Sequence, residues 1–285
     1  MQDLHIHVFP GRKDSPAEFV DKTRAAGVTG GAVLGMYPET FGKENEDQRW
    51  QARLDYVLDF CSQAPGFRPM FWLDPLAEDA LEQVQAAVEK GIAGFKVICN
   101  YFYPVKGLKT YQAIAETGLP LMFHSGVLYN EQPSSEYNRP MSYEFLMDVK
   151  GLRFSLAHIS WPWCAELVSL FGKLNYLDEC APEGRSQMYY DITPGTPPIF
   201  REEALRRIYM SGLRVKHRVL WGTDCTTNDY HVEYAKYWMD FDRNILAEIA
   251  ADPNIYRVAG QDEYDYSDIW DLATDGNFAA FYGKK

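Results

Sequence analysis

This sequence lacks paired cysteines, and this absence argues against disulfide cross-links and against an oxidising compartment. The chain has five cysteines, an odd number, and none of them forms a Cys-x-x-Cys motif. A disulfide framework or a structural zinc knot is therefore not expected, and a reducing compartment, the cytoplasm, is predicted. The first residues contain neither the basic segment nor the apolar core of a secretory signal, which favours the same location.

Positive charge and long apolar runs are also scarce. The 285 residues include 28 Lys and Arg against 40 Asp and Glu, which gives a formal net charge of −12. Nucleic acids are bound by clustered Lys and Arg, so a nucleic-acid partner is not expected. No apolar run reaches the roughly 18 residues that a membrane-spanning helix needs. Since 46% of the residues are hydrophobic, the chain can build a large folded core, and a small molecule is its expected partner.

Short apolar runs alternate with segments of helical periodicity along nearly the whole chain. Eight runs are found, over residues 4–8, 30–36, 69–73, 93–98, 119–123, 154–158, 188–192 and 218–224. Helices are expected over residues 15–27, 46–64, 76–90, 108–116, 142–149, 162–171, 198–210, 230–250 and 268–282. Eight strands that alternate with helices predict a (β/α)8 TIM-like barrel. A doubly wound sheet is the alternative, although no Gly-x-Gly-x-x-Gly motif follows the first run.

The domain organisation follows from the same pattern. We expect one barrel domain over residues 1–285, with a C-terminal helical extension over about residues 226–285. The segments 129–140 and 253–267 are expected to form surface loops or lids. The tyrosine-rich acidic stretch 230–266 suits contact between copies of the chain, so a homo-oligomer is a further expectation.

Histidine is rare, with six in the chain, yet two of them stand within the first seven residues. His5 and His7 alternate with apolar residues, so their side chains point to one face of a strand. Such a pair either chelates a cation or forms hydrogen bonds within a core. His124, His158 and Asp224 stand at the ends of the fifth, sixth and eighth runs. Because a barrel gathers these ends at one mouth, the five side chains predict a site for a divalent ion, most simply zinc.

Other side chains are expected near the same mouth. Lys96 would bridge two metal ions as a carbamate, hold a substrate carboxylate as an ammonium, or form a structural ion pair. Trp72 stands at the end of the third run, and Trp161 follows His158 after the sixth. Both are candidates for the walls of a substrate pocket, with packing against the next helix as the alternative for Trp161. Arg139 and Arg185 are expected in loops after the fifth and sixth strands, where either would clamp a carboxylate or simply be solvated.

The ordered motifs resemble the amidohydrolase superfamily, and most closely its amidohydrolase-2 (amidohydrolase-related) branch. The resemblance rests on Asp-Leu-His-Ile-His, Gly-Phe-Lys-Val, Phe-His-Ser-Gly, Leu-Ala-His-Ile, Trp-Gly-Thr-Asp and a late Gly-Asn-Phe. It implies a metal ion held by His5, His7, His124 and Asp224. In members with one metal, the residue that matches His158 contacts substrate or moves protons. In members with two, a carboxylated lysine that matches Lys96 bridges the ions.

We therefore expect a metal-dependent hydrolase with one Zn²⁺, or with a second metal ion if Lys96 is carboxylated. Asp224 would deprotonate the attacking water, and His158 would stabilise the developing oxyanion. The substrate would be a small amide, ester or lactone, with a carboxylate held by Lys96 or by an arginine. The same motifs would serve a non-oxidative decarboxylase of a small carboxylic acid. A barrel protein without metal or catalysis is the third alternative.

Overall fold

A computed structural model describes residues 1–9, 15–41, 49–180, 184–255 and 265–283. Its strands are β1 (Gln2–His7), β2 (Gly30–Leu34), β3 (Phe67–Trp72), β4 (Gly94–Val97), β5 (Leu121–Phe123), β6 (Arg153–Leu156), β7 (Gln187–Asp191), β8 (Val219–Leu220) and β9 (Cys225–Thr226). Neighbouring strands pair in parallel and follow chain order from β1 to β8, with β9 on the other side of β1. This topology confirms the predicted barrel architecture.

The short stretch from β8 to β9 joins the two edges of the sheet. β8 pairs with β7, whereas Cys225 of β9 lies opposite Ile6 of β1. Between these pairings, the amide of Leu4 donates to the carbonyl oxygen of Trp221 at 3.0 Å. Since every strand runs in the same direction, the carboxyl ends of all strands surround one mouth.

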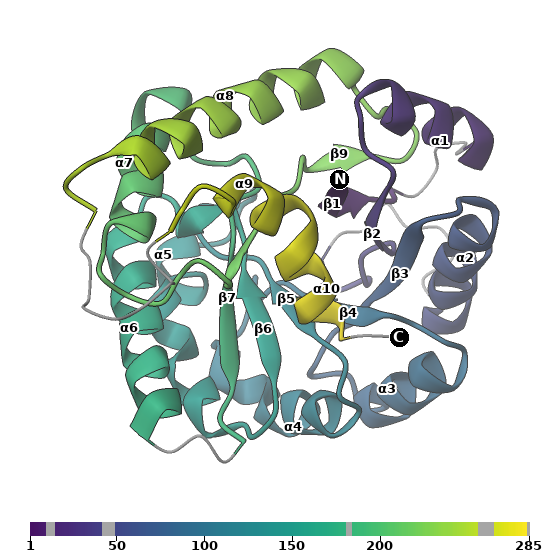
Figure 1. Cartoon of the computed structure of the whole chain (residues 1–285). Helices are drawn as coiled ribbons and strands as arrows, with labels where there is room; N and C mark the ends of the chain where they lie inside the picture. The colour runs from purple at the N-terminus through teal and green to yellow at the C-terminus, as the bar shows by residue number, and fades with distance from the viewer. Residues whose placement is uncertain (10–14, 42–48, 181–183, 256–264, 284–285) are drawn as a thin grey trace.

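Helices form the outer layer of the barrel (Figure 1). They are α1 (Pro16–Ala25), α2 (Trp50–Gln63), α3 (Ala80–Glu89), α4 (Leu108–Glu116), α6 (Cys164–Cys180), α7 (Pro198–Tyr209) and α8 (Val232–Ala251). Helix α8 contacts both α7 and α1 and so completes the ring. In the part of the chain that the structure describes, no helix has the length and apolar character needed to cross a membrane.

Three predicted helices have different forms in the structure, and one of them, expected over 268–282, is divided into two short α-helices with a π-helix between them. The segment 142–149 belongs to a 3-10 helix, η2 (Pro140–Asp148), rather than to an α-helix. 3-10 geometry is frequent in connecting segments, although nine residues is long for one. The helix expected over 162–171 continues as α6 to Cys180, because its buried side chains recur at helical spacing as far as Leu174.

Some predictions fall partly outside the described residues. The helix expected over 46–64 is described from Trp50, because residues 42–48 lie outside the described part. The predicted surface segment 129–140 contains a short helix, α5 (Ser134–Tyr137). The segment 253–267 is described only at its two ends.

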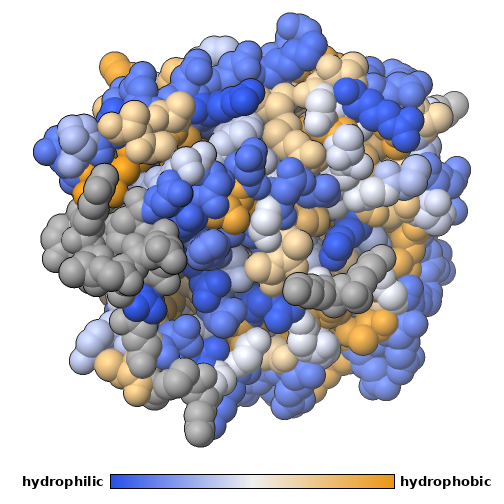
Figure 2. Space-filling view, viewed as in Figure 1, coloured by the Kyte–Doolittle hydropathy of each residue, from blue (hydrophilic) through white to orange (hydrophobic). Residues whose placement is uncertain are grey.

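The C-terminal segment closes the amino end of the barrel. Its elements are α9 (Ile269–Asp271), the π-helix η5 (Leu272–Gly276) and α10 (Asn277–Tyr282), which lie across the strands in Figure 1. Phe278 and Phe281 pack in one buried cluster with Leu4 and Met122 of the strands. The Asn277 amide donates to the carbonyl oxygen of Val219 at the start of β8, at 2.8 Å. Figure 2 shows mostly hydrophilic residues on this face, with separate small apolar spots.

Candidate metal centre and substrate cavity

The carboxyl ends of the strands surround a cavity of about 310 Å³. A group of lining residues, which we call the polar cluster, contains the side chains predicted to carry the chemistry: His5, His7, Lys96, His124, His158 and Asp224. Trp72 and Trp161 line the same cavity. The barrel therefore brings together residues from strands that are far apart in the sequence, as their positions at the strand ends predicted.

His5 is held in one tautomer by a buried carboxylate. Its Nδ1 donates to Oδ2 of Asp191 at 2.9 Å, and both side chains are fully buried. Asp191 ends β7, and its other oxygen accepts from the amide of Thr193 at 2.8 Å. With Nδ1 protonated, the lone pair of the neutral His5 ring lies on Nε2. Carboxylate–histidine pairs of this kind orient metal ligands in proteins.

Three potential ligand atoms converge beside this pair. His5 Nε2 lies 3.1 Å from His7 Nε2 and 3.6 Å from Oδ1 of Asp224. The same carboxylate oxygen lies 3.1 Å from His7 Nε2. Asp224 has a φ of 62°, in the left-handed region, and its amide donates to the His5 carbonyl oxygen at 2.9 Å. The strained turn after β8 therefore directs a carboxylate toward the two histidines of β1.

His158 and His124 extend the polar cluster along the next strands. His158 begins a short 3-10 turn, η3 (His158–Ser160), in which all three residues have positive φ. Its Nδ1 donates to the carbonyl oxygen of Pro194 at 2.9 Å, so Nε2 is left for a ligand or a proton. The His158 ring centre lies 5.3 Å from that of His5 and 5.0 Å from that of His124. Nε2 of His124 is buried and has no hydrogen-bond partner among the described residues.

Burial favours the neutral form of these imidazoles. It lowers the pKa of His5, His7 and His124 below the ordinary value of histidine. Desolvation acts against the charged form of Asp224, but the hydrogen bond with His7 and the charges of His5, His158 and His7 together outweigh it, and the pKa of the carboxyl falls below its ordinary value. Neutral imidazoles and an ionised carboxylate are the forms in which these groups bind metal ions.

Lys96 lies inside the cluster rather than at the rim of the cavity. Its Nζ is 3.4 Å from His5 Nε2, and the side chain is 1% exposed. Burial lowers the pKa of this ammonium to about 8. Among the described residues, no carboxylate forms an ion pair with Lys96, which argues against the structural ion pair among its predicted roles.

The polar cluster fits a divalent ion. Ligand atoms of His5, His158 and Asp224 all lie within 4.8 Å of one another, and His7 contacts two of these three residues. The fixed tautomer of His5 and the unpartnered Nε2 of His124 point to the same conclusion. Nitrogen and oxygen donors of this kind suit zinc and related ions. The strand-end pattern placed His158 among the candidate ligands, and the geometry likewise puts it within reach of an ion, in addition to the substrate or proton role that the family resemblance implies.

Two further carboxylates support the cluster and were given no role at the sequence level. Asp191 is the one acidic residue in the run Gln-Met-Tyr-Tyr-Asp of β7. A carboxylate at the end of a buried strand is a sequence signal that could have identified it as part of the site. Asp3 accepts from the amides of His5 and Thr223 at 3.1 and 3.0 Å, and from the hydroxyl of Tyr230 at 2.9 Å. It thereby ties β1 to the turn that carries Asp224.

Replacing Asp191 with Asn should weaken metal binding by about 10- to 100-fold, since the charge that orients His5 and raises its basicity is lost. Titration of the metal-free protein in competition with a chelating dye measures this affinity. Asp148→Asn is the matched control, because that carboxylate pairs with Arg185 at the surface. Equal affinities for the two variants would contradict the role of Asp191.

Gly195→Ala should disturb His158 without touching the other ligands. A Cβ at this position would lie 2.7 Å from Cβ and 3.0 Å from Cγ of His158, so the ring must move. A displacement of about 1 Å in a catalytic group can cost on the order of 10²-fold in rate, and steady-state kinetics would measure the loss in kcat. Gly172→Ala in α6 is the control, because the atoms nearest to its new Cβ belong to the side chain of Leu213, outside the polar cluster. A Gly195→Ala enzyme with unchanged kcat would exclude a catalytic role for His158.

The structure does not bring Arg139 and Arg185 into this cavity. Arg139 follows β5 as predicted, but its guanidinium pairs with Glu166 of α6 and lies over the ring of Trp163. Arg185 was expected on the mouth side and this was wrong. It directly precedes β7, because α6 occupies most of the connection from β6, and it pairs with Asp148 at 3.2 Å. We therefore assign neither arginine to substrate binding.

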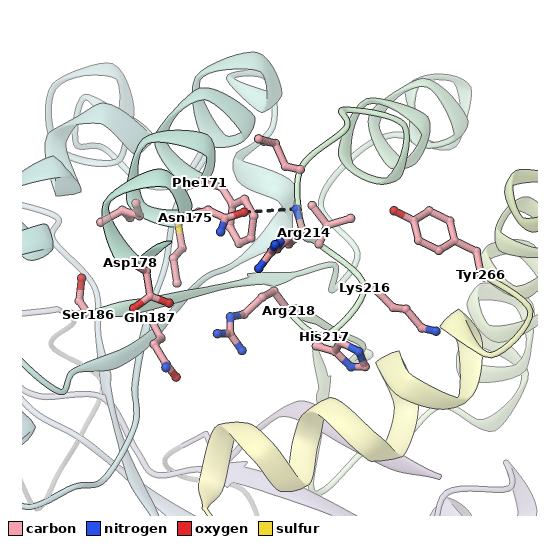
Figure 3. A pocket seen from close by; sticks show the side chains of 14 residues that line it. Phe171, Asn175, Asp178, Ser186, Gln187, Arg214, Lys216, His217, Arg218 and Tyr266 are labelled. Atoms are coloured by element: carbon pink, nitrogen blue, oxygen red, sulfur yellow. Dashed lines mark hydrogen bonds between the residues drawn. The ribbon is translucent and has the colours of Figure 1, made fainter. Parts of the chain in front are cut away.

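A second cavity, of about 370 Å³, lies near the amino ends of β7 and β8 (Figure 3). Asn175 Oδ1 accepts from the amide of Arg214 there at 3.2 Å, and Lys216 pairs with Asp268 at 2.9 Å. His217 lines this cavity, far from the strand ends that carry the polar cluster. Since barrel enzymes place their chemistry at the carboxyl ends of strands, the first cavity is the candidate active site.

Comparisons with known proteins identify the family and similar folds. Residues 3–258 match the model of a family described as Amidohydrolase. The fold is similar to a protein described as a 2-pyrone-4,6-dicarboxylic acid hydrolase from Acinetobacter baumannii, at 13% identity and a TM-score of 0.60 over 99% of this chain and 98% of that one. A protein described as a metal-dependent hydrolase from Lactobacillus casei gives 15% identity and a TM-score of 0.58 over 99% and 95%. A dihydroorotase from Campylobacter jejuni gives 16% identity and a TM-score of 0.53 over 100% of this chain and 83% of that one. A search of curated proteins gave no match.

Proposed function

Because the chain belongs to the amidohydrolase family, we propose that it is a metal-dependent hydrolase of a small amide, ester or lactone. The observation that carries this proposal is the convergence of His5 Nε2, His7 Nε2 and Asp224 Oδ1 at the carboxyl ends of the strands. A divalent ion held at such a site lowers the pKa of water toward neutrality and polarises a carbonyl oxygen.

The residues that would hold this ion are His5, His7, His124 and Asp224, most simply with one Zn²⁺. His158 is close enough to join them. A second ion would require Lys96 as a carbamate, because an ammonium has no lone pair with which to bind a metal ion. We favour the ammonium, which can hold a carboxylate of the substrate beside His5.

Different side chains of the polar cluster would then accept and donate the protons of the reaction. Asp224 takes a proton from the attacking water at its carboxylate and returns it to the leaving group. His158 uses Nδ1 for the Pro194 carbonyl, so only Nε2 can act on the substrate. As an imidazolium it donates from Nε2 to the developing oxyanion. Trp72 and Trp161 restrict the access of bulk water to these groups.

The proposal is tested with the metal-loaded protein and a panel of small esters, lactones, amides and carboxylic acids. Release of acid or amine that stops on chelation and returns with zinc would support the hydrolase. Release of carbon dioxide from a carboxylic acid would favour the decarboxylase, which needs the same ligands. Protein grown with added zinc that contains no stoichiometric metal would overturn the metal-dependent mechanism.

A further inference from the structure

One side of the cavity is apolar, and this side contains information about the substrate. Trp72 and Ile98 are buried there, and Phe9, Phe41 and Leu128 pack against them. All five residues line the cavity, and we call them the apolar wall. Carbon surfaces of this kind gain free energy when they cover the apolar part of a ligand.

The apolar wall begins where the polar cluster ends. The ring centres of Trp72 and Phe9 each lie 5.8 Å from that of His7. Phe41 continues the wall, with its ring centre 4.9 Å from that of Trp72. A group that reacts at the polar cluster therefore has its adjoining atoms next to aromatic rings, an arrangement that favours flat ring systems.

Trp161 lines the cavity from another direction, because it follows β6, which lies three strands from β3 around the barrel. Its ring stacks on that of Phe200 of α7, with centres 6.2 Å apart and an interplanar angle of 25°. The amide of Val127 donates to the Trp161 carbonyl oxygen at 2.9 Å. These contacts hold the second aromatic surface in place, so a flat body can lie between Trp161 and the apolar wall.

Positive charge is confined to the polar cluster. Among the described residues that line the cavity, Lys96 is the one lysine or arginine, and it lies beside His5. A carboxylate at the reacting end of a substrate can meet Lys96. A second carboxylate on the body of the substrate would lie against the apolar wall without a counter-ion, which is costly.

We propose, on the basis of the hydrolase function above, that the substrate has a small flat apolar body and no charged group on that body. The reacting carbonyl lies at the polar cluster, and the body lies between the apolar wall and Trp161. A cavity of about 310 Å³ is at the small end of the range for ligand sites, which suits a body of one or two rings.

The first test compares two acids that differ by one charge. Binding of benzoate and of isophthalate to the metal-loaded protein is measured by isothermal titration calorimetry. Isophthalate is expected to bind at least about tenfold more weakly, because its second carboxylate has no partner on the apolar wall. Equal binding, tighter isophthalate binding, or no benzoate binding at millimolar concentration would overturn the proposal.

The second test adds the missing cation. Leu128→Arg is expected to reduce or reverse the preference for benzoate over isophthalate, since a guanidinium on the wall can pair with the second carboxylate. Leu128→Gln is the matched control, because it removes apolar surface without adding charge, and its preference should stay near that of the unmodified protein. A preference that is the same in the Leu128→Arg and Leu128→Gln variants would show that the second carboxylate does not meet the wall.

Hydrolysis supplies a third, separate readout. 3-Isochromanone and δ-valerolactone are six-membered lactones of an alcohol, with and without a fused aromatic ring, and the ring should raise kcat/KM by about tenfold or more. Phe41→Ala should reduce this ratio. If neither lactone is cleaved while benzoate still binds selectively, the proposed function fails and the inference about the cavity stands. If both are cleaved at equal kcat/KM, the hydrolase stands and the inference fails.

Discussion

Asp224→Asn is expected to lower kcat by about 10²- to 10⁴-fold in the metal-loaded enzyme. An amide has nearly the shape of the carboxylate and keeps an oxygen as a ligand, but it does not accept a proton at neutral pH. The turn that positions this residue is held by its backbone amide, which donates to the His5 carbonyl oxygen, so the substitution leaves this bond in place. Initial rates on a substrate from the hydrolase panel, measured together with metal content, test the expectation.

Two further variants distinguish loss of the Asp224 proton acceptor from loss of the metal ion. His5→Ala should lose metal as well as activity, because it removes the side chain on which Asp191, His7 and Asp224 converge. Arg139→Gln should change neither quantity, since that side chain pairs with Glu166 outside the cavity. An Asp224→Asn enzyme that keeps its metal and nearly all its kcat would place proton transfer on another group.

Arg201→Met is expected to lower the free energy of unfolding by about 3–5 kcal/mol. Arg201 in α7 donates from Nε and Nη2 to the two carboxylate oxygens of Asp242 in α8, at 2.8 and 2.7 Å, and both side chains are fully buried. Nη2 also donates to the carbonyl oxygen of Ile192, directly after Asp191. Without the guanidinium, Asp242 is a buried charge whose described partner is Nε1 of Trp221, at 3.1 Å. Denaturant unfolding, followed by circular dichroism, measures the loss.

Two comparisons make this prediction specific. Arg207→Met changes an exposed arginine of the same helix that pairs with Glu203, and such pairs contribute about 0–1 kcal/mol. The double variant Arg201→Met with Asp242→Leu should recover part of the lost stability, because it removes the unpaired carboxylate. Equal destabilisation by Arg201→Met and Arg207→Met would contradict the importance of the buried pair.

Local features of the sequence determined most of the fold and the membership of the site. Parallel strands covered on both faces need continuous apolar runs, and these runs mark the barrel strands in order. The side chains that end such runs must meet at the mouth, which is why His5, His124, His158 and Asp224 could be assigned to one site. Positions in loops carry no such constraint. The end of the barrel at which Arg185 lies depends on how far α6 continues. Arg185 was misplaced because α6 continues beyond the helix that the sequence predicted.

Only the tertiary structure decided how these side chains act together. The tautomer of His5 depends on Asp191, which is 186 residues away in the chain, and that of His158 depends on a backbone carbonyl, that of Pro194. Neither contact has a periodic signature. The apolar wall is likewise assembled from Trp72 of β3, from residues that follow β1 and β4, and from loops whose side chains meet only when the barrel closes. The sequence by itself therefore determined which residues gather in the candidate metal centre, whereas the folded barrel decided their partners, their surroundings and the shape of the cavity, because these depend on contacts between distant strands.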